Sequence, residues 1–372
     1  MKILHVIECF SGGVYDFVRD FIDETPNYNH TILYGKREGL KEKFENDFKE
    51  NVDFILWKNA KREISLKNDF LALKELLNLL KKEKFDVIHL HSSKAGFLGR
   101  VAARICNQEN KVIYTTHGIS FLSKDISNRK LQLYIFLEKI GSLCGGKTIA
   151  CSKSEAEFIQ SKGIECNYIN NGTKLKNKEI KMEKKESKEL KVVTVGRITI
   201  QKNPKLFNEI AENFIDNKNM KFIWIGDGEL QEQLKSKNIE VTGWLSQKEV
   251  QQQLIEADVY LSTSSWEGLS LAALQAMENN LPLLLSDCVG NIDLVEEDYN
   301  GFLFKTKEEV IEKIKFLTKD KEKIKELIRK AVISAGNSLD VLQLCAIAYM
   351  KIGESDKAAY VLRQLVNEQY NE

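Results

Sequence analysis

The chain has 372 residues, 43% of them hydrophobic and 29% charged, which is the composition of a globular protein long enough for two domains. Its 55 Lys and Arg residues nearly balance its 54 Asp and Glu residues, so the sequence offers no general attraction to nucleic acid. No stretch approaches the roughly 20 apolar residues of a membrane span. The N-terminal MKILHVIECF is too short and too polar for a signal peptide.

Seven cysteines are scattered along the chain without a C-x-x-C pair or a zinc spacing, a pattern typical of a reducing compartment. We therefore expect a cytoplasmic protein. Any membrane contact is expected to be peripheral, at the inner face of the cell membrane.

The first part of the chain alternates apolar strands with amphipathic helices. Strands are predicted over residues 2–7, 30–34, 52–57, 86–90, 111–115 and 147–151. Helices are predicted over residues 14–21, 70–80, 98–105 and 129–144, and from Lys153, which Ser152 precedes as an N-cap. The first strand is followed by Ser11-Gly12-Gly13, so strand, Gly-rich turn and helix form a Rossmann-like unit. This alternation predicts an α/β domain with a doubly wound parallel sheet over residues 1–173.

A Lys- and Glu-rich stretch at 174–190, with almost nothing to bury, predicts an exposed linker. The βα pattern then restarts and predicts a second Rossmann-like domain over 191–330. Its strands are expected at 191–195, 221–225, 239–242 and 259–261, and its helices from Pro204, near Glu229 and at 247–256. Ligands in such sheets bind outside the carboxyl ends of the strands, so two facing domains would enclose a cleft.

The tail at 331–372 departs from this pattern. Residues 339–368 resemble one tetratricopeptide repeat, with Ala348, Tyr349, Gly353, Ala358 and Ala359 at fitting positions. A single repeat cannot bury its face alone, so it would pack on the enzyme, on a second copy or on a protein partner. The alternative is an ordinary helical pair that closes the fold.

The segment 259–277 is the most informative stretch for function. An apolar strand is followed by a polar turn and then by a helix-forming run that begins near Leu271. Unpaired N–H groups at a helix start favour anions, and Gly268 and Ser270 are small enough to admit a phosphate. Glu267 could accept hydrogen bonds from hydroxyl groups, and Gln275 follows two helical turns later. The alternative is an ordinary strand-to-helix junction.

This segment resembles the E-x7-E region of the family 4 retaining glycosyltransferases, which have the two-domain GT-B fold. The first acid matches at Glu267, whereas Gln275 replaces the second, and Gly268-Leu269-Ser270 departs from the usual pattern. The resemblance implies that Glu267 holds donor-sugar hydroxyls and that Gln275 contacts the ribose. An amide forms a weaker hydrogen bond than a carboxylate, so we expect a lower affinity for the nucleotide.

Two basic residues follow a strand end at Gly196-Arg197 and Lys202. A guanidinium fork and an ammonium suit a diphosphate, and together they could neutralise a leaving phosphate without a metal. The family uses the same arrangement for the donor diphosphate, and the three residues match it one by one. The alternative is a pair of ordinary surface cations.

Further positions match the family more loosely. Asp227 lies in a Gly-rich loop near the nucleotide, and Trp244 and Leu245 lie near the base, where Trp244 could stack or could simply pack in a core. In the first domain, Gly12 and Gly13 match the turn that faces the diphosphate. His117 matches the histidine expected to hold sugar hydroxyls through its backbone and ring. His91, Ser92 and Lys94 could contact the acceptor or a phosphate, or form a solvated loop.

We find no Ser/His/Asp set, no D-x-D pair at a strand end and no metal cluster in the sequence, so neither a metal nor a separate cofactor is predicted. The resemblance covers about residues 1–304. It implies a metal-independent, retaining hexosyltransferase that moves a sugar from a nucleotide sugar, UDP-linked by our reading, to a saccharide acceptor. The acceptor would be lipid-linked, in bacterial surface polysaccharide assembly. The alternatives are a degenerate GT-B subunit that binds a partner, and a nucleotide-sugar epimerase.

Overall fold

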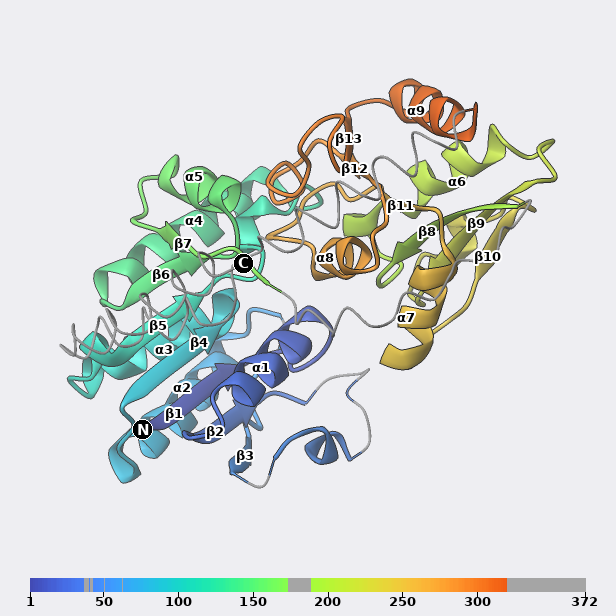
Figure 1. Cartoon of the computed structure of the whole chain (residues 1–372). Helices are drawn as coiled ribbons and strands as arrows, with labels where there is room; N and C mark the ends of the chain where they lie inside the picture. The colour runs from blue at the N-terminus through green and yellow to red at the C-terminus, as the bar shows by residue number, and fades with distance from the viewer. Residues whose placement is uncertain (37–39, 41–42, 50, 62, 173–188, 320–372) are drawn as a thin grey trace, which may run out of the picture. The chain divides into compact units, whose positions relative to one another are not determined.

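The computed structural model describes residues 1–319 except 37–39, 41–42, 50, 62 and 173–188. Most of the predicted linker and the whole repeat-like tail at 331–372 therefore lie outside the described residues. The backbone separates into two compact α/β units (Figure 1). The first comprises Met1–Leu122 and Ile126–Asn171, and the second includes residues 189–319.

The first unit is built on a seven-stranded parallel sheet with the order β3-β2-β1-β4-β5-β6-β7. Its strands are β1 (Lys2–Ile7), β2 (Asn29–Tyr34), β3 (Val52–Leu56), β4 (Val87–His91), β5 (Val112–Thr115), β6 (Lys147–Ala150) and β7 (Asn167–Tyr168). Its helices are α1 (Gly13–Glu24), α2 (Leu66–Lys82), α3 (Ser93–Ile105), α4 (Asn128–Leu143) and α5 (Lys153–Gln160). The strand order reverses between β1 and β4, which places the loops after these two strands at the topological switch point.

The second unit repeats the architecture with six parallel strands in the order β10-β9-β8-β11-β12-β13. Its strands are β8 (Leu190–Val195), β9 (Met220–Ile225), β10 (Ile239–Val241), β11 (Val259–Ser262), β12 (Leu283–Ser286) and β13 (Gly301–Phe304). Its helices are α6 (Pro204–Glu212), α7 (Gln247–Glu256), α8 (Leu271–Glu278) and α9 (Lys307–Lys319). Here the order reverses between β8 and β11, the two strands that precede Arg197 and Glu267.

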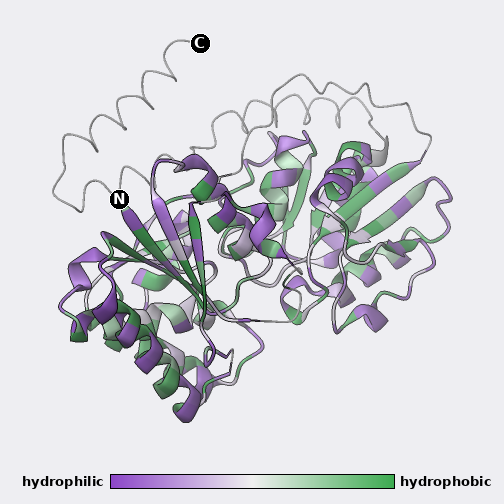
Figure 2. Ribbon diagram, turned by 90° about the horizontal axis from the view of Figure 1, so that it is seen from below, coloured by the Kyte–Doolittle hydropathy of each residue, from purple (hydrophilic) through white to green (hydrophobic). Residues whose placement is uncertain are grey.

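Each sheet is buried by helices on both faces, which explains why its strands are mainly apolar. Figure 2 shows the strands mainly in green and the helices with green and purple faces. The core of the second unit contains the fully buried rings of Phe207, Phe222, Trp224 and Phe302. This packing fixes the strand ends that carry the candidate site.

The expected strands and most expected helices are confirmed, but the helix predicted near Glu229 is wrong. The chain forms only a short 3-10 turn there, at Gln231–Gln233. The preceding Gly228 packs against the backbone of Ile198, where a side chain would collide with the carbonyl oxygen. This stretch therefore packs as a loop against the backbone of Ile198 instead of forming a helix. Four further elements were not predicted: β7, which is two residues long, β12, β13 and α9.

Candidate functional site

The turn between β11 and α8 is fixed by contacts at both of its ends. Ser270 caps α8, accepting a hydrogen bond from Ala273 N at 3.3 Å. The amide of Glu267 donates to the carbonyl of Val289 at 3.1 Å. Gly290 has a φ of +85°, and a Cβ there would lie 2.6 Å from the carbonyl oxygen of Gly268. The neighbouring loop can approach the turn this closely only because it has glycine at that position.

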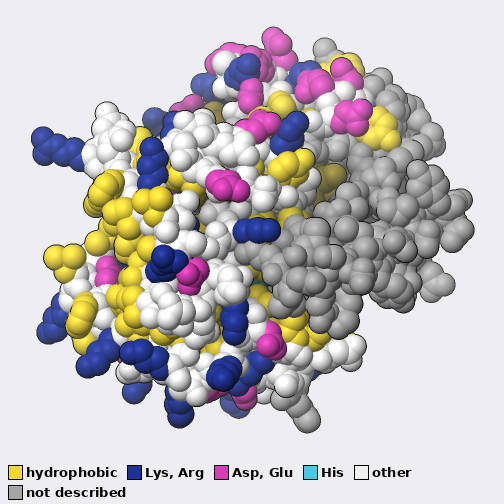
Figure 3. All heavy atoms as spheres, turned by 90° about the vertical axis from the view of Figure 1, so that its left-hand side faces the viewer, with side chains coloured by type: hydrophobic (Ala, Val, Ile, Leu, Met, Phe, Trp, Pro, Cys, Tyr) yellow, Lys and Arg dark blue, Asp and Glu magenta, His cyan; other side chains and the backbone are white. Residues whose placement is uncertain are grey.

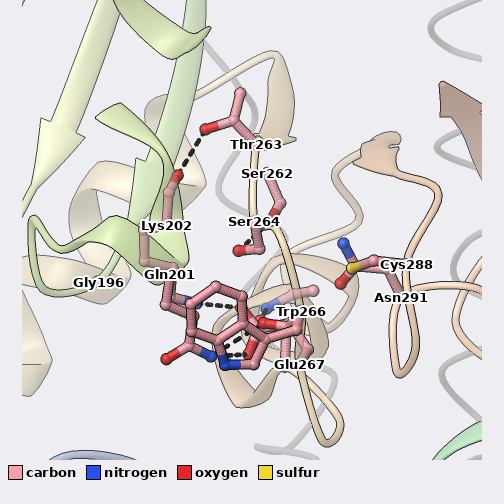
Figure 4. Close-up of polar contacts among 12 residues, drawn as sticks. Gly196, Gln201, Lys202, Ser262, Thr263, Ser264, Trp266, Glu267, Cys288 and Asn291 are labelled. Atoms are coloured by element: carbon pink, nitrogen blue, oxygen red, sulfur yellow. Dashed lines mark hydrogen bonds and ion pairs between the residues drawn. The ribbon is translucent and has the colours of Figure 1, made fainter. Parts of the chain in front are cut away.

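Lys202 and Glu267, predicted from separate motifs, form a tight ion pair (Figure 4). Lys202 Nζ lies 2.6 Å from Glu267 Oε1, and the two side chains are only 18% and 8% exposed. Burial disfavours the charged amine, but the Glu267 carboxylate outweighs that effect and the pKa of Lys202 is raised. Gln201 Nε2 donates to Glu267 Oε2 at 3.3 Å and to the carbonyl of Trp266 at 3.0 Å. Sequence reasoning missed Gln201.

The local backbone explains how Lys202 reaches Glu267. Gly196, directly after β8, has a φ of +146°, and a Cβ there would lie 3.1 Å from the Cε of Lys202. Its carbonyl accepts a hydrogen bond from Trp224 Nε1 at 2.8 Å. Asn203, with a φ of +50°, caps α6 and Pro204 begins that helix, so the chain turns sharply after Lys202. Thr263 Oγ1 donates to the carbonyl of Lys202 at 2.7 Å and ties the two loops together.

Arg197 is not part of this pair. Its side chain is 49% exposed, and its Nε lies 3.6 Å from Glu229 Oε2. An ion pair this exposed contributes little energy, so Arg197 can exchange Glu229 for another anion at small cost.

The other strand-end loops of the second unit lie beside Gly196. Gly226 forms an antiparallel bridge with Gly243 and packs against the carbonyl of Gly196. The Asp227 carboxylate accepts a hydrogen bond from Gly228 N at 2.6 Å. These loops therefore cluster at the carboxyl ends of β8, β9 and β10.

Two residues predicted to lie near the nucleotide base, Trp244 and Leu245, follow β10. Trp244 is 66% exposed, which contradicts the interpretation of this residue as a core tryptophan. Its ring is free to stack on a planar ligand. Leu245 is half-buried beside it.

Gln275 lies in the second turn of α8, the helix that follows the turn carrying Glu267. Its carbonyl accepts hydrogen bonds from Asn279, through the amide at 3.3 Å and through the side chain at 2.8 Å. Within the described part of the chain, its side-chain amide has no hydrogen-bond partner. Gly268 and Leu269 are buried next to the Ser270 cap, so the helix start is lined by small and apolar groups.

In the first unit, Gly12 has a φ of +60° as the N-cap of α1, and the space where its Cβ would lie is open. Gly13 begins the helix. His117 follows β5 with a φ of +51° and is partly buried. Its ring nitrogens contact His91 and Cys151, and desolvation lowers the pKa of the ring to about 3.

Glu155, which the sequence analysis missed, holds the loop that carries His117. One carboxylate oxygen accepts hydrogen bonds from Thr116 Oγ1 at 2.8 Å and from the amides of Gly118 at 3.0 Å and Ile119 at 2.8 Å. The other accepts from Cys151 N at 2.8 Å. The available signal was the spacing of Ser152 and Glu155, which resembles an N-terminal capping pair. Ser152 does cap α5, but the buried carboxylate of Glu155 bonds to the loop that carries His117.

The residues after β4 are held within the first unit. The Lys94 ammonium pairs with Asp69 at 2.7 Å, so the solvated-loop interpretation is wrong for this side chain. His91 is fully buried, and Ser92 has a φ of +70°. Among the described residues, His5, His89 and His91 form the one group whose ligand atoms, within 4.8 Å of one another, could hold a metal ion. Within the described ranges, no helix is long and apolar enough to cross a membrane.

Comparison with known proteins identifies the family of the chain. Residues 12–176 match the model of Glycosyltransferase Family 4, and residues 176–332 match that of Glycosyl transferases group 1. The chain is 35% identical to the UDP-Gal:alpha-D-GlcNAc-diphosphoundecaprenol alpha-1,3-galactosyltransferase of Escherichia coli, over 65% of this chain and 68% of that protein. It is 30% identical to the O-antigen biosynthesis glycosyltransferase WbnH of Escherichia coli, over 76% of this chain and 81% of that one.

Solved structures share the fold. Anabaena Alr3699/HepE in complex with UDP and glucose aligns with a TM-score of 0.76 at 17% identity, covering 96% of this chain and all of that one. Sucrose-phosphate synthase from Thermosynechococcus elongatus aligns with a TM-score of 0.75 at 15% identity, over 99% of this chain and all of that one. The chain therefore belongs to the family 4 glycosyltransferases, and its two Rossmann-like units are those of the GT-B fold.

Proposed function

We propose that this chain is a retaining, metal-independent hexosyltransferase that takes its sugar from a UDP-sugar. The observation that carries the proposal is the buried Lys202–Glu267 pair between the ends of β8 and β11. Ligands of open α/β sheets bind at this switch point. The pair supplies a cation for a phosphate and a carboxylate for hydroxyl groups within one small volume.

The pairing of Glu267 bears on the mechanism. One of its oxygens is bound to Lys202 and the other accepts from Gln201. Such a carboxylate is better suited to accept hydrogen bonds from sugar hydroxyls than to attack an anomeric carbon. We therefore assign Glu267 to the donor sugar and favour same-face transfer, in which the leaving phosphate takes the acceptor proton.

Charge on the leaving diphosphate would be neutralised by Lys202 and Arg197. Arg197 is half-exposed and only loosely held by Glu229, so it can turn to the phosphates when the donor binds. In the first unit, the open space at Gly12 and the α1 start at Gly13 would admit a phosphate, as the family resemblance implies.

The remaining residues would hold the nucleoside and the sugar. The exposed Trp244 ring and the adjacent Leu245 are assigned to the base. The side-chain amide of Gln275, which has no hydrogen-bond partner among the described residues, is assigned to the ribose. Gly196, Asp227 and the helix start at Gly268-Leu269-Ser270 would line the donor site through their backbone. His117 would lie near the donor sugar, as the family resemblance implies.

The acceptor is proposed to be a saccharide on a lipid diphosphate, used in surface polysaccharide assembly. Support comes from the Escherichia coli relative, whose name specifies a diphosphoundecaprenol acceptor. Such an acceptor would bring the enzyme to the inner membrane face as a peripheral protein.

A nucleotide-sugar screen tests the proposal. The protein should hydrolyse one UDP-sugar slowly, be protected against heat by UDP, and retain activity in EDTA. NMR of the product should show the anomeric configuration of the donor. No UDP binding together with tight binding to a protein partner would favour the degenerate subunit, and isomerisation of the sugar without an acceptor would favour the epimerase.

A further inference from the structure

All five histidines of the chain gather on one face of the first sheet. They come from β2, β1, β4 and the loop after β5, and α1 covers them with Phe17 and Phe21. His5, His30, His89 and His91 are at most 2% exposed. In Figure 3, no histidine side chain (cyan) is visible among the coloured side chains of the face in view. Five imidazoles brought into one apolar layer require an explanation, because buried polar groups must find partners.

Four of them form a continuous line of hydrogen bonds, which we call the histidine chain: His30, His5, His91 and His117. His30 Nδ1 lies 3.2 Å from His5 Nε2, and His5 Nδ1 lies 3.2 Å from His91 Nε2. His91 Nδ1 lies 3.0 Å from His117 Nε2. Every link joins an Nδ1 to the next Nε2, so the chain has a direction. The fifth histidine, His89, packs against His91 and bonds to Thr115.

The two ends of the histidine chain set that direction. At the deep end, His30 Nε2 lies 3.2 Å from both the carbonyl and the hydroxyl oxygen of Thr25. The carbonyl can only accept, and the hydroxyl already donates to the carbonyl of Phe21 at 2.6 Å. His30 must therefore donate through Nε2, which leaves its Nδ1 as an acceptor.

The same choice then passes along the line. A neutral imidazole has one donor and one acceptor, so each following ring must donate through Nε2 and accept through Nδ1. At the far end, His117 Nδ1 accepts from Cys151 Sγ at 3.7 Å. Burial raises the pKa of the Cys151 thiol, which keeps its proton available for this bond. Reversing the line would set the lone pair of His30 against a carbonyl oxygen.

We propose that the histidine chain is a positioning device that fixes His117 as the Nε2–H tautomer with Nδ1 as an acceptor. Its relevance to catalysis rests on the proposed transfer reaction, in which His117 lies near the donor sugar. The thiol is a weak donor at 3.7 Å and is easily displaced. A substrate hydroxyl that reaches His117 Nδ1 must donate its proton to this nitrogen. The histidine chain therefore allows this hydrogen bond in only one direction.

NMR of the full-length protein with 15N-labelled histidine tests the inference, because only five imidazoles contribute signals. At pH 7, the four members of the histidine chain should all be neutral and protonated on Nε2. A His117 ring that is charged, or that carries its proton on Nδ1, would overturn the proposal. So would stoichiometric zinc uptake that shifts the His5, His89 and His91 signals, since a metal would replace the hydrogen bonds.

Two substitutions at opposite ends separate a coupled line from local contacts. Cys151→Ala should leave the His117 tautomer unchanged, because the Thr25 end still sets the direction. His30→Phe in the Cys151→Ala background removes both anchors, and the Nε2–H population of His117 should fall from above 90% to about half, as expected for two forms of similar energy. If Cys151→Ala alone changes the tautomer, the bonds are not coupled and the proposal fails.

The same experiment stays independent of the proposed function, since it uses no substrate. An intact tautomer pattern in a protein without transferase activity would contradict the proposed function alone. Full activity with a His117 that carries Nδ1–H would contradict the histidine chain alone.

Discussion

Replacing Glu267 with glutamine separates the structural role of the buried ion pair from its role in transfer. The substitution keeps the size of the side chain and removes its charge, which leaves the Lys202 ammonium unpaired in a site where only 18% of the side chain is exposed. Breaking a buried pair by removing one partner costs about 3 kcal/mol at the lower end of measured values. For a unit of this size, that lowers the melting temperature by roughly 6–12 °C.

The catalytic effect is expected to be separate. A charged hydrogen bond to a donor-sugar hydroxyl is worth roughly 1.5–3 kcal/mol, so kcat/KM should fall by roughly 10- to 150-fold. The matched control is the double variant Lys202→Met with Glu267→Gln, which removes both charges. It should recover most of the lost thermal stability, because no uncompensated charge remains, and it should recover none of the activity.

Calorimetry and steady-state kinetics on the wild type, both single variants and the double variant complete this thermodynamic cycle. A Glu267→Gln enzyme with wild-type turnover would refute the assignment of Glu267 to the donor. A double variant that regains activity along with stability would show that the pair is purely structural.

Four further outcomes are expected. First, acid should destabilise the first unit: burial lowers the pKa of His89 to about 3, below the unfolded value, so the unfolded chain binds more protons and stability is lost as the pH falls below 6.5. At pH 5 this single residue costs about 2 kcal/mol relative to pH 7, which pH-dependent denaturant titration measures. The groups that face it are other histidines and the phenylalanines of α1. Second, Gln275→Glu should tighten UDP binding in isothermal titration, because a carboxylate accepts more strongly from ribose hydroxyls. Third, Gly290→Ala should cost about 2 kcal/mol of stability and lower activity, since its φ is +85° and the new Cβ would collide with the 263–270 turn. Fourth, Glu155→Gln should cost about 2–3 kcal/mol, because one acceptor oxygen becomes a donor that faces backbone amides.

Each of these has a contrary result. A flat stability profile between pH 5 and pH 7 would show that the histidines titrate normally. Unchanged or weaker UDP binding by the Gln275→Glu variant would contradict the assignment of Gln275 to the ribose. A Gly290→Ala or Glu155→Gln protein as stable as the wild type would show that the surrounding loops relax without cost.

The sequence predicts the general fold well, because parallel strands buried on both faces give apolar runs between helical patterns. Its failures have local causes. The helix expected near Glu229 is replaced by a 3-10 turn, since the preceding glycine loop packs against the backbone of Ile198. The strand β7 is only two residues long and carries too few side chains to show a period.

The candidate site was predictable where a motif is local and not where it depends on contacts across the sheet. Lys202 and Glu267 stand 65 residues apart, and each was identified from its own turn. Their pairing follows from β8 and β11 being neighbours at the reversal of strand order. The histidine chain gives no local signal, because its links join residues 25 to 86 positions apart.

Binding of UDP and of uridine to the Lys202→Met variant tests the central claim most directly. Isothermal titration should show that this variant binds UDP at least ten-fold more weakly than the wild type, because the ammonium that meets the phosphates is gone. Its affinity for uridine, which has no phosphate, should match that of the wild type. Equal affinity of both proteins for UDP would contradict the account.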